Sequence, residues 1–130
     1  MTNHEKIYSL YAKFFHSASR YWVDDSETNL TFLKTVQNQM NEQLKEDGYL
    51  FLNDVYIALG IRRTKHGQVC GWIYDEDNTI GDNFVDFGIY DKNDKDCIRF
   101  VNGEEDVILL SFNVDGNILG RIPDDRLPVV

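Results

Sequence analysis

The chain has 130 residues, 42% of them hydrophobic and 13% aromatic, so it is long enough for one packed domain and too apolar to be disordered. Its net charge is −9, and the whole excess lies in residues 73–130, which carry fourteen acids and five bases. Such an acidic surface repels nucleic acid and anionic membranes and attracts basic proteins. We therefore expect a basic protein partner, no membrane, and no direct binding of nucleic acid.

The sequence also indicates a compartment. No stretch approaches the roughly eighteen apolar residues of a membrane span, and the first fifteen residues lack the layout of a signal peptide. We expect a cytoplasmic protein, in which Cys70 and Cys97 stay reduced and act as small apolar side chains.

The first half of the chain predicts helices. Apolar residues recur at three- and four-residue steps over residues 4–16, which indicates an amphipathic helix of about three turns. A second amphipathic helix is expected to start near Ser26 or Thr28, either of which can cap it. It should end at about Glu46, because Gly48 is suited to the left-handed position beyond a helix.

A short apolar run, residues 49–52, precedes a third expected helix. Asn53 is suited to the N-cap of that helix, Asp54 to its first turn, and Gly60 to the left-handed residue after its end. A two-turn helix over residues 53–60 is therefore predicted.

The second half predicts strands, because apolar and polar residues alternate from residue 69 onward. Asp115-Gly116 is typical of a two-residue hairpin turn. The expected strands are Val69–Tyr74, Phe84–Tyr90, Cys97–Val101, Val107–Val114 and Asn117–Ile122, with Val107–Val114 central because it is apolar on both faces.

These elements predict an α+β fold. Two amphipathic helices and one short helix, in residues 1–60, are expected to pack on an antiparallel sheet of four to five strands in residues 69–122. Residues 123–130 are expected to be a loose tail, and the whole chain, residues 1–130, a single domain.

The acidic loop over residues 75–86 invites a calcium hypothesis, since carboxylates are the oxygen ligands that Ca²⁺ prefers. The spacing argues against it, because the turning glycine falls seventh from Asp75 instead of sixth and the twelfth residue is Asp86 instead of Glu. We expect a solvated turn and predict no metal ion or other cofactor.

One basic cluster interrupts the sequence, formed by Arg62, Arg63 and Lys65. Three charges cannot supply the many phosphate contacts that give affinity for nucleic acid. Two interpretations stay open: the cluster neutralises the acidic edge of the sheet within the molecule, or it contacts an anion or a partner.

No set of residues predicts catalysis. The three histidines have no metal-ligand spacing, the motifs of phosphate-binding loops and nucleophile elbows are absent, and Gly67 argues against a helical pairing of His66 with Cys70. We expect a protein that is not an enzyme. By contrast, Tyr21 and Trp22 lie outside the helical patterns and next to two aspartates, which favours an aromatic contact surface there.

Four segments carry a resemblance: LFLNDVYIALGI (50–61), RTKHGQVCGWIYD (63–75), GDNFVDFGIYD (81–91) and FVNGEEDVILLSFNVDG (100–116). Together they resemble an uncharacterised family of small proteins from phages and integrative mobile elements of Gram-positive bacteria. The resemblance covers roughly the last two-thirds of the chain and implies a mobile-element accessory protein without implying any site residue.

The sequence therefore favours a non-enzymatic protein-binding accessory factor, with an anti-defence inhibitor, such as an anti-CRISPR protein, as one form of it. The alternatives are a phage structural or assembly protein that forms homo-oligomers, and a small metal- or nucleotide-dependent enzyme. A homodimer is compatible with the leading function. The expected partner-binding residues are Asp75, Glu76, Asp77, Asp82, Tyr21, Trp22, Arg62, Arg63 and Lys65.

Overall fold

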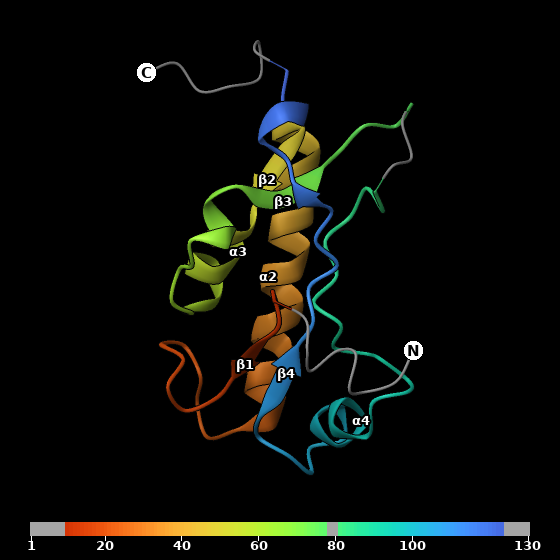
Figure 1. Cartoon of the computed structure of the whole chain (residues 1–130). Helices are drawn as coiled ribbons and strands as arrows, with labels where there is room; N and C mark the ends of the chain where they lie inside the picture. Colours follow the sequence, from red (N-terminus) through yellow and green to blue (C-terminus); the bar gives the residue numbers. More distant parts are fainter. Residues whose placement is uncertain (1–9, 78–80, 124–130) are drawn as a thin grey trace.

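The computed structural model describes residues 10–77 and 81–123. The long helix α2 forms the axis of the molecule, with a small antiparallel sheet beside each end (Figure 1). In chain order the elements are β1 (Lys13–Phe15), α2 (Ser26–Asp47), β2 (Tyr49–Phe51), α3 (Leu52–Leu59), η1 (His66–Gln68), β3 (Cys70–Ile73), α4 (Lys95–Val101), β4 (Ile108–Leu110), β5 (Gly116–Asn117) and η2 (Leu119–Arg121).

Helix α2 forms where the apolar spacing predicts it. Most residues between the buried positions of this helix are exposed. The buried side chains follow one stripe along the helix: Asn29, Leu33, Val36, Met40 and Leu44. Gly48 ends the helix in the left-handed conformation, at φ 83°, and its N–H donates to the Leu44 carbonyl. The N-cap residue is Asp25, so the predicted cap by Ser26 or Thr28 is wrong. The side chain of Asp25 makes no capping hydrogen bond.

The α+β class is confirmed, and the strands divide between two sheets instead of one. β1 pairs antiparallel with β4, whereas β3 lies between β2 and β5 in a three-stranded antiparallel sheet. The central strand is therefore β3, which contains the fully buried Trp72, and the predicted central strand over residues 107–114 is reduced to β4.

The predicted helix over residues 4–16 is wrong where it can be compared with the structure. Residues 10–12 are not helical, Lys13–Phe15 form β1, and residues 4–9 lie outside the described part. Phe15 is fully buried and Phe14 is 55% exposed, as expected where successive side chains of a strand point to opposite faces. The aromatic spacing looked helical because pairing with β4 leaves no local signal.

Helix α3 spans Leu52–Leu59 and ends at Gly60, which is left-handed at φ 72°. The N-cap residue is Phe51, so the predicted capping by Asn53 is wrong. The side chain of Asn53 is buried and bonds the backbone of Thr64 instead.

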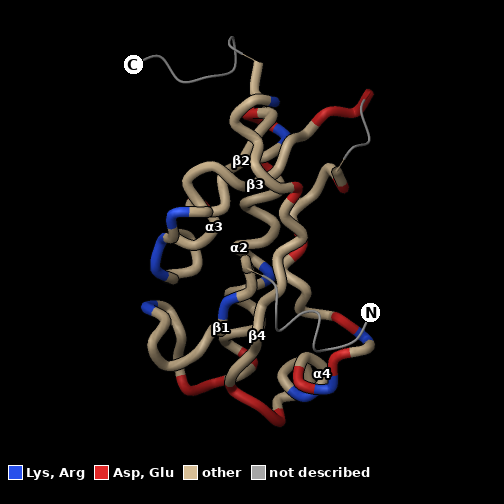
Figure 2. The backbone as a smooth tube through the Cα atoms, in the orientation of Figure 1, with Lys and Arg blue, Asp and Glu red and all other residues tan. Residues whose placement is uncertain are grey.

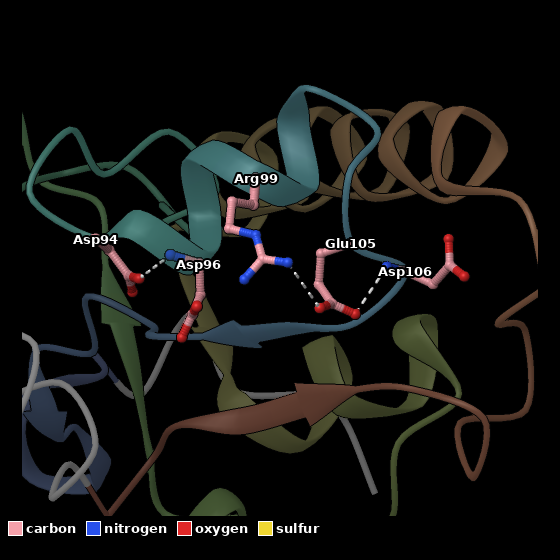
Figure 3. A network of polar contacts seen from close by, with 5 residues as sticks. All are labelled: Asp94, Asp96, Arg99, Glu105 and Asp106. Carbon is pink, nitrogen blue, oxygen red and sulfur yellow. Dashed lines mark hydrogen bonds and ion pairs between the residues drawn. The ribbon is translucent and has the colours of Figure 1, made fainter.

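Helix α4 replaces the strand predicted over residues 97–101 (Figure 3). The Asp94 carboxylate accepts hydrogen bonds from the N–H groups of Asp96 (2.9 Å) and Cys97 (3.3 Å), which fixes the first turn. Cys97 and Phe100, three residues apart, are the buried side chains of the helix. The Arg99 guanidinium pairs with the Glu105 carboxylate at 3.9 Å.

Residues 84–90 belong to neither sheet, and Gly88 within them takes the left-handed conformation at φ 75°. The predicted alternation is present, since Val85, Phe87 and Ile89 are buried. Their backbone partners, however, are mostly side chains: the Gln37 amide oxygen accepts from the Phe87 N–H at 2.8 Å, and Asn41 bonds both backbone groups of Val85. This segment therefore lies against α2 without being part of a sheet.

The hairpin predicted at Asp115-Gly116 is also wrong. β5 follows Asp115 and pairs with β3, while β4 pairs with β1. The strand expected over residues 117–122 shortens to the second residue of β5 followed by the 3-10 helix η2. Residues 124–130 of the predicted tail lie outside the described part of the chain.

Candidate functional site

The first candidate surface is acidic and follows β3. Asp75, Glu76, Asp77 and Asp82 are all exposed, and we call them the acidic edge. The Asn83 side chain joins the two parts of this edge: its oxygen accepts from the Asp75 N–H at 3.1 Å, and its nitrogen donates to the Asp75 carbonyl at 3.0 Å. Asp75 and Asn83, which are eight positions apart in the sequence, are thereby held together.

Neutral groups hold the carboxylates of the acidic edge. The Tyr74 hydroxyl donates to Glu76 at 2.8 Å, the Asp77 N–H to Asp75 at 3.0 Å, and the Asn113 side-chain nitrogen to Asp82 at 3.0 Å. Hydrogen bonds from neutral donors orient a carboxylate and leave its charge in place. The edge is therefore ordered and negatively charged.

Asp115 lies beside this edge and differs from it in burial. Its carboxylate accepts a hydrogen bond from the Ile73 N–H at 2.9 Å. Partial burial raises the pKa of Asp115 above its ordinary value, against the lowering effect of that hydrogen bond and of Arg121. The side chain thus fixes the start of β5 to β3 from a partly desolvated position.

The structure places Tyr21 and Trp22 in different environments. The Trp22 indole N–H donates to the Asp106 carbonyl at 2.7 Å, and the ring is partly buried against the core. Tyr21 is 44% exposed, and its ring lies 5.7 Å from that of Phe32. Tyr21 is thus open to a partner. Trp22 instead joins the loop that follows β1 to the segment that precedes β4.

The second candidate surface is basic and surrounds a pocket of about 410 Å³. Its lining combines three cations with three neutral polar residues: Arg62, Arg63, Lys65, Asn53, Thr64 and Gln68. The cations that line the pocket belong to the loop between α3 and η1. In Figure 2 the blue part of this loop beside α3 lies away from the red segment that follows β3. Sequence reasoning found its cations and missed its neutral donors, since Asn53 was assigned to a helix cap.

Arg20 is a basic residue of the same side that the sequence did not single out. Its N–H donates to the Gly60 carbonyl at 3.0 Å, which brings the loop before α2 against the end of α3. A methyl group on Gly60 would lie 2.7 Å from the Tyr21 ring, so the two segments touch. Tyr21 and the basic loop are therefore neighbours, and the acidic edge stands apart from both (Figure 2).

The remaining reactive groups do not form a site with a recognisable chemistry. Within the described residues, no three His, Cys, Asp or Glu side chains are grouped so that they could hold a metal ion. Cys70 and Cys97 are both buried, as predicted; the Tyr11 hydroxyl donates to Cys70 Sγ at 3.7 Å, and Cys97 Sγ donates to the Gly88 carbonyl at 3.5 Å. The hydrogen bond to Cys70 raises the pKa of Tyr11, and burial of the hydroxyl adds a smaller effect in the same direction.

An apolar groove of about 270 Å³ lies beside α4. Tyr90 and Ile98 are its most exposed apolar members, at 55% and 43%. Lys92 and Asp91 stand among the lining residues. The groove is shallow and offers an apolar contact without an arrangement of groups that would act on a substrate.

Within residues 10–77 and 81–123, no helix is long and apolar enough to cross a membrane.

Comparison with known proteins gives one match. No curated protein and no solved structure is similar enough to count as a relative. The match is to a family of unknown function, DUF6353, over residues 1–122, so it includes the helical region that the resemblance in the sequence did not cover. The chain therefore belongs to DUF6353, a family of unknown function.

Proposed function

We propose that this protein is a non-enzymatic accessory factor that binds a basic protein through the acidic edge. The observation that supports this proposal is the lack of internal neutralisation. Between residues described by the structure, the one ion pair joins Arg99 and Glu105 at 3.9 Å, far along the chain from Asp75 and Asp82. The four carboxylates of the acidic edge are thus exposed and form no ion pair with a described cation, so in a chain of net charge −9 they attract cationic surfaces.

The order within the acidic edge adds to this support. A partner that meets carboxylates already oriented by Tyr74, Asn83 and Asn113 loses less side-chain freedom on binding. Tyr21 offers a separate exposed aromatic ring, of the residue type that often contributes strongly to protein interfaces. Tyr21 is a second contact for an extended partner, because it stands apart from the acidic edge.

The biological setting of the proposal is a phage or an integrative mobile element in a bacterial cytoplasm. It rests on the four resembling segments described above and on the small size and acidity of the chain. In that setting an acidic binding protein is suited to inhibit a basic host enzyme, including a defence nuclease. Genes encoding other inhibitors beside this one would support that role, whereas capsid or tail genes would contradict it.

Charge-neutral variants test the binding mode directly. The tagged protein is used to capture partners from a bacterial host lysate, and the captured protein is purified and titrated again with the variant D75N/E76Q/D77N/D82N. We expect at least about a tenfold loss of affinity at low salt, and a smaller loss at high salt where charges are screened. A matched control, E27Q/E42Q/E46Q/E104Q, removes four exposed charges elsewhere and should bind like the unmodified protein. Equal affinities for the two variants would contradict the proposal.

The groove beside α4 favours one alternative, a phage assembly protein that forms homo-oligomers. Its exposed members Tyr90 and Ile98 would be covered in such an assembly. Light scattering separates the two functions: a large symmetric oligomer that the variant I98S converts to smaller species would favour assembly. A monomer or dimer unaffected by I98S would favour the accessory factor.

A further inference from the structure

We infer that the basic pocket binds the phosphate group of a small molecule. This site is independent of the function proposed above, because it uses positive charge on a different side of the molecule (Figure 2). The inference depends on three observations: the loop is held in place before any ligand arrives, its cations form no ion pair with a described carboxylate, and its neutral lining residues add donors.

The loop is fixed by Asn53, whose side chain is only 8% exposed. The Asn53 oxygen accepts from the Thr64 N–H at 2.9 Å, and its nitrogen donates to the Thr64 carbonyl at 3.0 Å. Gly67 closes against this contact, since a methyl group there would lie 1.9 Å from the Asn53 oxygen. The Gly67 N–H in turn donates to the Thr64 hydroxyl at 3.0 Å. Arg62, Arg63 and Lys65 therefore extend from a loop that is already positioned.

The three cations have no internal counter-charge among the described residues. None forms an ion pair with a described carboxylate, and no carboxylate lines the pocket. Arg99, by comparison, has Glu105 at 3.9 Å. In a chain with 22 acids and 13 bases, three neighbouring cations without a described acidic partner contradict the idea that the cluster neutralises the acidic edge within the molecule.

The lining chemistry matches a phosphate. Each guanidinium presents paired N–H donors that fit two oxygens of one phosphate, and Lys65 adds a third cationic donor. The Thr64 hydroxyl accepts from Gly67, which leaves its own hydrogen to donate, and the Gln68 amide lies in the same lining. A dianion can therefore be bound by charged and neutral donors together.

The overall charge decides the size of the ligand. A long polyanion such as nucleic acid would be repelled by the net charge of −9, and three cations release too few counterions for tight binding. A small molecule that enters a pocket of about 410 Å³ meets the cations without passing over the acidic edge. The ligand class is thus a small phosphate or diphosphate compound.

Titration with inorganic pyrophosphate and inorganic phosphate tests the site. We expect saturable binding by calorimetry and shifts of the backbone amide signals of residues 64–68 in nuclear magnetic resonance spectra. The variant R62Q/R63Q should bind pyrophosphate at least about tenfold more weakly, because two charge-assisted hydrogen-bonding groups are lost. Both side chains are exposed, so the thermal unfolding midpoint should stay unchanged.

The control variant K34Q/K45Q removes two exposed cations from α2 and should bind pyrophosphate like the unmodified protein. Equal weakening in both variants would overturn the inference, since it would show attraction to net charge alone. So would an absence of saturation up to about 10 mM pyrophosphate, which corresponds to no site of useful affinity. Succinate is the third ligand, and succinate that binds as tightly as pyrophosphate would overturn the assignment to phosphate.

Discussion

Asparagine side chains replace neighbouring strands at several places in this protein. In each case one amide accepts from the backbone N–H of a residue and donates to the carbonyl of that same residue, at 2.7 to 3.1 Å. The pairs are Asn29 with Val23, Asn41 with Val85, Asn53 with Thr64 and Asn83 with Asp75. Segments outside the two small sheets thus gain the hydrogen bonds that a strand would have supplied.

The pair of Asn41 and Val85 gives the sharpest test of these contacts. Replacing Asn41 by Ala leaves two backbone groups of the buried Val85 without their partners, so we expect a loss of about 2 to 4 kcal/mol of unfolding free energy. Asn38→Ala, on the exposed side of α2, should be neutral or slightly stabilising because Ala favours helices. Urea unfolding of both variants measures the difference. If Asn41→Ala lowers the free energy of unfolding no more than Asn38→Ala does, this account is contradicted.

Gly71 offers a second prediction at the scale of one residue. A methyl group at this position would lie 1.9 Å from the Leu50 carbonyl oxygen, in the neighbouring strand β2. Gly71→Ala must therefore separate β3 from β2 and should cost about 2 kcal/mol or more of unfolding free energy. Gly120→Ala is the matched control, because nothing lies within 4 Å of its added methyl group. Thermal unfolding that ranks the two variants equally would be inconsistent with a tight contact at Gly71.

At the scale of elements, α4 depends on its first turn. It has only seven residues, too few to be stable without help. Asp94→Ala removes the side chain that accepts from Asp96 and Cys97, and we expect a loss of about 1 kcal/mol of unfolding free energy. Asp94→Asn, which keeps the acceptor, should restore most of it. Hydrogen exchange at Cys97 would rise in the Ala variant alone if the cap acts locally.

Elements with local signals were predictable, and those with distant partners were not. Gly48 and Gly60 end their helices as the sequence indicated, and the buried stripe of α2 follows its apolar spacing. The apolar spacing of residues 4–16 predicts a helix where β1 lies, because the identity of β1 depends on β4, which lies more than ninety residues later. The segment around Phe87 alternates as a strand does, yet its backbone bonds the Gln37 side chain of α2 and the backbone of Ser111, partners that no pattern reveals.

The candidate site shows the same division. The charges of Asp75 and Arg62 are evident in the sequence, and so is the separation of the acidic half. The pocket is not, because it requires Asn53 to reach Thr64 across eleven positions. Arg20 was missed for the same reason: its place beside Gly60 depends on a backbone contact between distant segments.

For the whole molecule, we expect stability to increase on mild acidification. Burial raises the carboxyl pKa of Asp54 and of Asp115 above the ordinary value of 3.8. Between that value and the raised pKa, the folded chain holds more protons than the unfolded chain, so the free energy of unfolding rises as the pH falls. The gain is complete below the ordinary pKa and is lost as the pH increases through the raised one.

Urea unfolding between about pH 7 and pH 4 measures this dependence. Asp115→Asn keeps an acceptor for the Ile73 N–H and removes the partly buried charge, so the variant should show a smaller change with pH. Glu42→Gln, exposed on α2, is the control and should behave like the unmodified protein. A steeper pH dependence in Asp115→Asn would mean that Asp115 contributes with the opposite sign, which would refute the explanation.

The asparagine contacts have a consequence for how this surface can change over evolution. They hold Thr64 in the basic loop and Asp75 in the acidic edge through the backbone atoms of these residues, so these contacts do not depend on which side chains the neighbouring surface residues carry. Among relatives, the side chains of both surfaces can vary while Asn53 and Asn83 keep the loops in place. A single frame can in this way present different charges to different partners.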